Sequence, residues 1–127
     1  MLGSHPATAT VAVKDLEVAR RFYVETLGLT LLSSEPEVLV LGAGQTRLFA
    51  YLSKFAGTNQ ATAVTWSLGA QLESVVGELV KRGVRFEHYE LPGIKRDGDL
   101  HRSGDGSDFA VAWFKDPDGN IHSLMSA

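Results

Sequence analysis

One order of strand and helix patterns occurs twice in this chain, and the repeat constrains the fold more than any other feature of the sequence. The first copy starts with alternating apolar residues over 7–13 and continues into a helix, which Asp15 can cap and Gly28 can end. Three strand patterns complete it. The pattern restarts at an offset of 55 residues, where Gly83 takes the place of Gly28. Side-chain identity between the copies is poor, so the repeat is one of pattern, and it predicts two β-α-β-β-β modules.

The repeat divides one predicted domain, residues 7–127, into module one at 7–53 and module two at 61–126. A polar, glycine-bearing connector at 54–60 lies between the modules. Apolar runs predict further strands at 29–33, 38–41, 47–52, 61–68 and 85–90. The second helix carries the apolar stripe Leu72, Val75 or Val76, Leu79 and Val80.

The last two strands are predicted within 109–126, where two apolar runs flank the turn Asp116-Pro117-Asp118-Gly119. Pro117 fixes its own φ and Gly119 tolerates a positive φ, so this stretch is predicted to be a hairpin. Residues 91–108 precede it, with four glycines and a mixed-charge centre. Loops of this length without secondary structure are uncommon unless they are functional, so this segment is predicted to be a lid over a pocket.

The closing hairpin also carries a family resemblance. It resembles the last hairpin of the vicinal oxygen chelate superfamily, which includes glyoxalase I, extradiol dioxygenases, fosfomycin-resistance enzymes and bleomycin-binding proteins, through the run Trp113-Phe114-Lys115-Asp116-Pro117-Asp118-Gly119-Asn120. The resemblance covers residues 7–124. It implies an α+β fold in which two βαβββ modules form a curved mixed sheet, a half-barrel, with the helices outside and a cavity on the concave face.

In metal-dependent members of that superfamily, His, Glu or Gln ligands come from the first and fourth strands of each module. The resemblance carries these positions onto Thr8, Leu48, Ala63 and Ser123. Alanine and leucine have no donor atom, and neutral hydroxyls bind catalytic divalent ions poorly. A shift by one residue would bring in only His122. We therefore expect neither a metal nor another cofactor.

Small or apolar residues at the ligand positions leave room for an organic molecule. Strand alternation predicts that the pocket floor consists of Thr8, Thr10, Leu48, Ala50, Ala63, Thr65, Val111, Trp113, Ile121 and Ser123. Trp113 would be the stacking platform, with its indole N–H as an orienting donor. The alternative is that Trp113 only fills the barrel. Trp66 is expected in the core under the second helix.

The histidines keep other chemistry open. His101 lies among basic residues of the segment 91–108, where it could contact a ligand or, together with Tyr89, take part in proton transfer. The same basic cluster also fits a solvated loop. His88, His101 and His122 have no standard metal-ligand spacing, but a non-standard site could combine them with nearby carboxylates.

These features predict a metal-free protein that binds a small organic metabolite or antibiotic in its concave pocket. The alternative is a glyoxalase-like lyase or isomerase, or another metal-dependent enzyme with non-standard ligands. A third reading is a structural or interaction module whose own side chains close the pocket.

Composition limits the partners and the location. Twelve basic and fifteen acidic residues give a net charge of −3, which argues against a nucleic-acid partner. The chain has no cysteine and no apolar run near the roughly 18 residues that span a bilayer, so we expect no membrane partner and a cytoplasmic location. An open half-barrel exposes its edge strands and its apolar face. That exposure predicts a homodimer, with 54–60 as the hinge if modules are exchanged.

Overall fold

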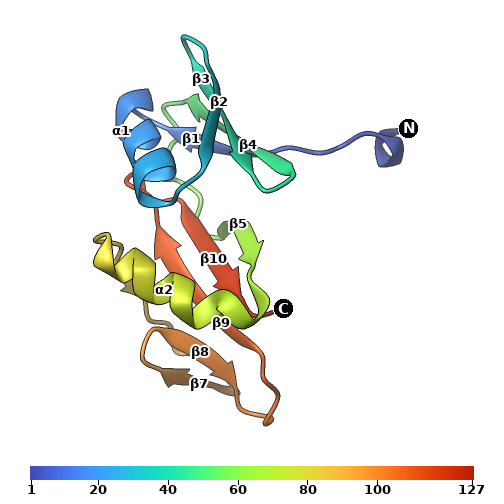
Figure 1. Cartoon of the computed structure of the whole chain (residues 1–127), viewed down its shortest axis with the longest axis vertical. Helices are drawn as coiled ribbons and strands as arrows, with labels where there is room; N and C mark the ends of the chain where they lie inside the picture. The colour runs from blue at the N-terminus through green and yellow to red at the C-terminus, as the bar shows by residue number, and fades with distance from the viewer. The chain divides into compact units, whose positions relative to one another are not determined.

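The computed structural model describes residues 1–127 in full and contains two compact units. Unit 1 consists of Met1–Thr58 with Pro117–Asn120, and unit 2 consists of Asn59–Asp116 with Ile121–Ala127. Each unit has its own sheet and its own helix (Figure 1). The predicted α+β class is confirmed, with the strands in two mixed sheets rather than one. None of the helices is long and apolar enough to cross a membrane.

Unit 1 contains the predicted β-α-β-β-β order. Its strands are β1 (Ala9–Val13), β2 (Thr30–Ser34), β3 (Val38–Ala43) and β4 (Thr46–Leu52), in the spatial order β1-β4-β3-β2. β1 runs parallel to β4, and the other neighbours are antiparallel. The helix α1 (Leu16–Arg20) continues as a π-helical segment at Arg21–Thr26, and a short 3₁₀ helix at Leu2–Ser4 precedes β1.

The ends of the first helix follow the sequence prediction. The Asp15 carboxylate accepts hydrogen bonds from the backbone N–H groups of Glu17 at 2.9 Å and Val18 at 3.1 Å. It therefore satisfies donors that the first turn leaves without a helical partner. Gly28 ends the helical region with a φ of 83°, a conformation that glycine adopts without strain.

The core of unit 1 lies between one face of the sheet and the first helix. Residues that pair across strands share a face, and Ala50 pairs with both Val11 and Leu39. Ala19 and Tyr23 of the helical region are also buried. The buried sheet residues on this helix-covered face are Val11, Val13, Leu39, Leu41, Leu48 and Ala50.

Unit 2 has the same beginning and end as unit 1 but more strands between them. Its elements are β5 (Thr62–Ser67), a 3₁₀ turn at Gly69–Gln71, α2 (Leu72–Lys81), β6 (Phe86–Glu87), β7 (Ile94–Asp97), β8 (Leu100–Ser103), β9 (Ala110–Lys115) and β10 (Ile121–Met125). The sheet order is β5-β10-β9-β8-β7, and β6 also pairs with β9. As β1 does with β4, β5 runs parallel to β10.

Residues 91–108 are not the loop without secondary structure that the sequence predicted. The segment contains the β7–β8 hairpin, and β8 adds to the sheet by pairing His101 with Val111 of β9. Asp97 pairs with Leu100 around a turn in which Gly98 has a φ of 62°. The two loop residues are Gly98 and Asp99, and a glycine followed by an aspartate favours a two-residue hairpin turn, so this dipeptide was the signal that could have identified the hairpin. The strand predicted at 85–90 is shorter, covering only Phe86–Glu87.

The helix α2 covers one face of the unit 2 sheet (Figure 1). Leu72, Val76 and Leu79 of α2 are buried, as the predicted stripe requires, but Val80, which was also placed in the stripe, is 47% exposed. On the sheet, Phe114 is 1% exposed, and its ring stacks on Trp66 with centroids 6.3 Å apart. Trp66 therefore packs into this core, as expected from the sequence.

Candidate functional site

The face of the unit 2 sheet away from α2 collects several of the predicted site residues. Ser123 of β10 pairs with Trp113 of β9 and with Thr65 of β5, so these three side chains share a face. His101 joins them from β8 by pairing with Val111. Arg102, the next residue of β8, points the other way and contacts α2. We call the surface formed by Thr65, Tyr89, His101, Val111, Trp113 and Ser123 the Trp113 face.

Three rings meet on the Trp113 face. The Trp113 centroid lies 4.8 Å from that of His101 and 5.3 Å from that of Tyr89, both in edge-to-face geometry. The rings of Tyr89 and His101 are 6.1 Å apart. Aromatic pairs at these separations attract one another beyond the area they bury. The rings therefore form one rigid wall rather than three independent side chains.

Both ring nitrogens of His101 are held by the backbone. Nε2 accepts the N–H of Tyr89 at 2.9 Å, so the ring proton is on Nδ1, which donates to the carbonyl oxygen of Val111 at 3.3 Å. The side chain is buried, and this burial lowers the pKa of His101 below its usual value. His101 is therefore a neutral structural ring. Because both nitrogens are engaged by backbone groups, neither is free for the proton transfer considered from the sequence.

The other partner considered for proton transfer, Tyr89, has a raised pKa, caused first by burial and then by the carboxylate of Glu87. Its phenol stays protonated. Tyr89 therefore contributes a ring to the wall and not a base.

The indole N–H of Trp113, predicted to orient a ligand, donates instead to the hydroxyl oxygen of Thr62 at 3.2 Å. A register shift between Ile121 and His122 pairs Ile121 with Thr62 and leaves Ala63 out of the ladder. Thr62 therefore takes the place predicted for Ala63 beside Trp113. Nothing in the sequence marks this irregularity.

The hydroxyls of Thr65 and Ser123 lie 2.7 Å apart and form a hydrogen bond. Ser123 is 4% exposed whereas Thr65 is exposed, so this pair is a half-buried polar feature of the Trp113 face. Each hydroxyl keeps a second hydrogen-bonding capacity. The pair can therefore serve a ligand as donor and as acceptor.

Four predicted floor residues belong to unit 1, and the strand register corrects two of them. Leu48 and Ala50 lie on the helix-covered face with Val11, and both are buried. Thr10 lies on the opposite face, and Thr8 precedes β1. Leu48 and Ala50 are therefore core residues of unit 1 and cannot line the same surface as Thr10.

Turn length explains the error. Position 48 was chosen by counting four residues from Gly44, in the way that Ser123 follows Gly119. The β3–β4 turn contains only residues 44–45, whereas the β9–β10 turn contains residues 116–120. Because side chains alternate along a strand, the same count ends on opposite faces in the two units.

The donor atoms of this chain do not fit a catalytic divalent ion. The three histidines considered for a non-standard site lie apart: His88 bonds Asp99 at 2.8 Å, His101 bonds the backbone, and His122 packs between Trp66 and Phe114 on the α2 side. Burial lowers the pKa of His122 to about 4. No group of three His, Asp or Glu side chains comes together. Divalent metals at catalytic sites need such a group.

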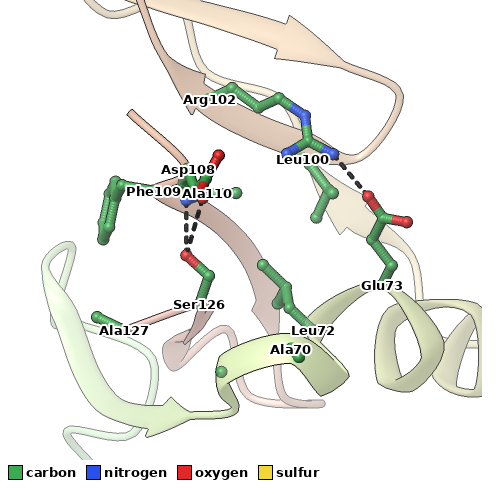
Figure 2. A pocket seen from close by; sticks show the side chains of 11 residues that line it. Ala70, Leu72, Glu73, Leu100, Arg102, Asp108, Phe109, Ala110, Ser126 and Ala127 are labelled. Atoms are coloured by element: carbon green, nitrogen blue, oxygen red, sulfur yellow. Dashed lines mark hydrogen bonds and ion pairs between the residues drawn. The ribbon is translucent and has the colours of Figure 1, made fainter. Parts of the chain in front are cut away.

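A pocket that the sequence did not predict lies on the other side of the unit 2 sheet, beside the start of α2 (Figure 2). Its volume is about 460 Å³, within the range of small-molecule sites. We call it the α2 pocket. It is lined by Gly69, Ala70, Leu72, Glu73, Leu100, Arg102, Asp108, Phe109, Ala110, Ser126 and Ala127. Five of these residues lie in or beside the hairpin segment that was predicted to be a loop.

Comparisons with known proteins agree on the fold. A family model described as the Glyoxalase/Bleomycin resistance protein/Dioxygenase superfamily matches residues 5–122. None of the curated proteins compared with the chain is similar enough to match it.

Three solved structures illustrate the range of similar proteins. A glyoxalase/bleomycin resistance protein/dioxygenase from Alicyclobacillus acidocaldarius is 20% identical with a TM-score of 0.76, covering 95% of this chain and 89% of its own. A bleomycin-binding protein in complex with bleomycin is 18% identical with a TM-score of 0.70, covering 97% and 98%. A lactoylglutathione lyase from Agrobacterium tumefaciens is 14% identical with a TM-score of 0.69, covering 96% and 92%.

Proposed function

This chain belongs to the glyoxalase/bleomycin resistance protein/dioxygenase superfamily, and we propose that it binds a small organic metabolite or antibiotic on the Trp113 face without a metal ion. One observation carries the proposal: the rings of His101, Trp113 and Tyr89 form a wall beside the hydroxyls of Thr65 and Ser123. Apolar walls with a few placed polar groups are the usual composition of small-molecule sites.

The chemistry of the wall limits the ligand. His101 is neutral and Tyr89 is protonated, so neither ring offers a charge for a strongly ionic group. Flat aromatic surfaces favour a ligand with a planar or apolar part that packs against them. The hydroxyl pair can then fix the orientation of one polar group. A partly aromatic, uncharged moiety fits this surface best.

The two tryptophans provide a test with an internal control. Each gives one indole N–H signal in a nitrogen-15 NMR spectrum, and Trp113→Phe and Trp66→Phe assign them. Bleomycin is the first probe, because a protein with the same fold was solved with it, and a panel of aromatic metabolites follows. We expect a saturable shift of the Trp113 signal, with binding about tenfold weaker in Trp113→Phe.

Trp66→Phe should bind as the unchanged protein does, because Trp66 lies on the α2 side of the sheet. A ligand that shifts only the Trp66 signal, or that binds Trp113→Phe with undiminished affinity, would contradict the proposed site. So would the absence of saturable binding across the panel.

The enzymatic alternative has less support. A lactoylglutathione lyase shares the fold at 14% identity, which is a likeness of fold alone. The residues at the ligand positions of this chain are Thr8, Leu48, Ala63 and Ser123, and they supply hydroxyls at most. Metal analysis of protein purified without chelator tests the alternative. Stoichiometric zinc, nickel, manganese or iron that purifies with the protein would overturn the metal-free proposal.

Two further parts of the proposal concern assembly and location. We propose a homodimer, because each sheet leaves two edge strands, β1 and β2 in unit 1 and β5 and β7 in unit 2. Light scattering at low micromolar concentration tests it, and a mass near 13.7 kDa would reject the dimer. The cytoplasmic location stays a prediction from the sequence, and fractionation of the source cells would test it.

A further inference from the structure

The α2 pocket has an apolar floor built by a helix and a sheet. Leu72 of α2 and Leu100 of β8 are 3% and 6% exposed, and Ala110 of β9 is 2% exposed. The hydroxyl of Ser126 does not add polarity to this floor. It accepts the N–H of Ala110 at 2.9 Å and donates to the carbonyl oxygen of Asp108 at 3.4 Å. The floor therefore suits the apolar body of a ligand.

The charged side chains that line the α2 pocket favour a positively charged ligand. Arg102 is held between two carboxylates, with Nη2 at 2.6 Å from Glu73 and Nε at 2.9 Å from Asp97. A third carboxylate, that of Asp108, also lines the pocket and makes no hydrogen bond or ion pair of its own. Figure 2 shows Glu73 and Asp108 on different sides of the space. Of the charged side chains that line the pocket, Arg102 and Glu73 are thus paired with each other, and the unpaired Asp108 carboxylate is the group left to attract a cation.

An aromatic ring completes the lining. Phe109 borders the pocket and is 39% exposed, so part of its ring is open to a ligand. The face of a phenylalanine ring attracts cations through its quadrupole. Figure 2 shows the Phe109 ring beside Asp108 at the edge of the space. A positively charged group near Asp108 would meet both a carboxylate and a ring.

We infer that the α2 pocket is a second ligand site and that it takes an organic ammonium ion with an apolar or aromatic body. The ammonium group lies beside the Asp108 carboxylate and the Phe109 ring, and the body lies on Leu72, Leu100 and Ala110. This site is on the opposite side of the sheet from the Trp113 face and does not depend on the function proposed there.

Three probes that share a phenyl group and differ in charge test the inference: 2-phenylethylammonium, 2-phenylethanol and phenylacetate. Backbone amide NMR signals of Ala70, Phe109 and Ala110 report on the pocket. We expect saturable shifts with the cation, affinity about threefold to tenfold weaker with the alcohol, and no saturation with the anion. Added salt should weaken the binding of the cation more than that of the other two probes, because screening reduces its attraction to exposed carboxylates.

Asp108→Asn removes one negative charge from the pocket and should weaken the affinity for the cation about threefold to fivefold. Glu90→Gln is the matched control, since it removes a carboxylate of unit 2 that does not line the pocket. Trp113→Phe should leave this binding unchanged, which separates it from binding on the Trp113 face. Equal affinity for all three probes, equal effects of Asp108→Asn and Glu90→Gln, or no saturation of any pocket signal would overturn the inference.

Discussion

Units 1 and 2 share a framework but differ in what their open sheet faces carry. In both, the first strand lies parallel to the last, and one face is buried under a helix. On the other face of unit 1, Phe49 and Tyr51 make no ring contact, and Tyr51 is 41% exposed. On the corresponding face of unit 2, Trp113 is fixed among other rings. The framework alone therefore does not make a site.

The difference comes from an added hairpin. In unit 1 only residues 35–37 connect β2 to β3, whereas in unit 2 residues 88–109 lie between β6 and β9. This longer stretch contains β7 and β8 and supplies both Tyr89 and His101. The candidate site of unit 2 is thus an addition to the repeated framework, and variants can test the shared and the added parts separately.

The largest effects should come from the shared part. Phe114 and Leu41 are 1% and 0% exposed on the helix-covered faces of units 2 and 1. Phe114→Ala should lower the free energy of unfolding by about 3–5 kcal/mol and Leu41→Ala by about 2–5 kcal/mol, because each leaves a cavity. Urea denaturation measures both. Val80→Ala, on the exposed side of α2, is the control and should change it by less than about 0.5 kcal/mol. A cost below about 1 kcal/mol at either core position would show that the two faces are not equivalent.

Acidification should lower the free energy of unfolding by an intermediate amount, and this loss should originate in unit 2. The pKa of His122 is lowered to about 4 by burial, so the unfolded chain binds a proton at a higher pH than the folded chain does. Stability is therefore lost as the pH falls from about 6.5 towards about 4, by on the order of 2–3 kcal/mol. The lowered pKa of His101 acts in the same direction.

Urea unfolding between pH 7 and pH 4 tests this linkage. His122→Leu should flatten part of the pH dependence, whereas His5→Gln, in the exposed N-terminal segment of unit 1, should not. An unchanged pH profile in His122→Leu would mean that the loss of stability has another origin.

The smallest effect isolates the added part. His101→Phe keeps a ring against Trp113 but removes the acceptor for the Tyr89 N–H and the donor to Val111. We expect a loss of about 1–3 kcal/mol in the free energy of unfolding, together with a shift of the Trp113 indole signal. Tyr51→Phe on the open face of unit 1 should change stability by less than about 0.5 kcal/mol. Equal effects of the two variants would remove the distinction between the faces.

Features set by neighbouring residues were predictable from the sequence. The Asp15 cap, the helix end at Gly28 and the closing hairpin all depend on rules that act within a few residues. The α+β class followed from their order. The grouping of Thr65, Trp113 and Ser123 also followed, because alternation along paired strands holds where the register is regular.

The remaining features depend on register and on long-range pairing. The length of the β3–β4 turn determines on which face of the sheet Leu48 and Ala50 lie. A register shift in the β5–β10 pairing places Thr62, and not Ala63, beside Trp113. The ring wall depends on the pairing of His101 in β8 with Val111 in the neighbouring strand β9, and the loop predicted at 91–108 excluded that pairing. The α2 pocket depends on how a helix packs on a sheet. None of these features can be predicted from the spacing of residues along the chain.

The β9–β10 turn has a consequence for dividing this protein into fragments. Although both of its strands belong to unit 2, residues Pro117–Asn120 of the turn are part of unit 1. Asp118 accepts the N–H of Lys14 at 3.2 Å, and Asn120 donates to the carbonyl oxygen of Ala12 at 2.8 Å. Gly57 approaches the Asp118 carbonyl so closely that a β-carbon there would overlap it. A cut after residue 58 therefore separates unit 1 from four of its own residues. The two pieces of such a split protein should recover a native unit 1 only by reassociating, and the repeat in the sequence is not a line along which the chain can be divided.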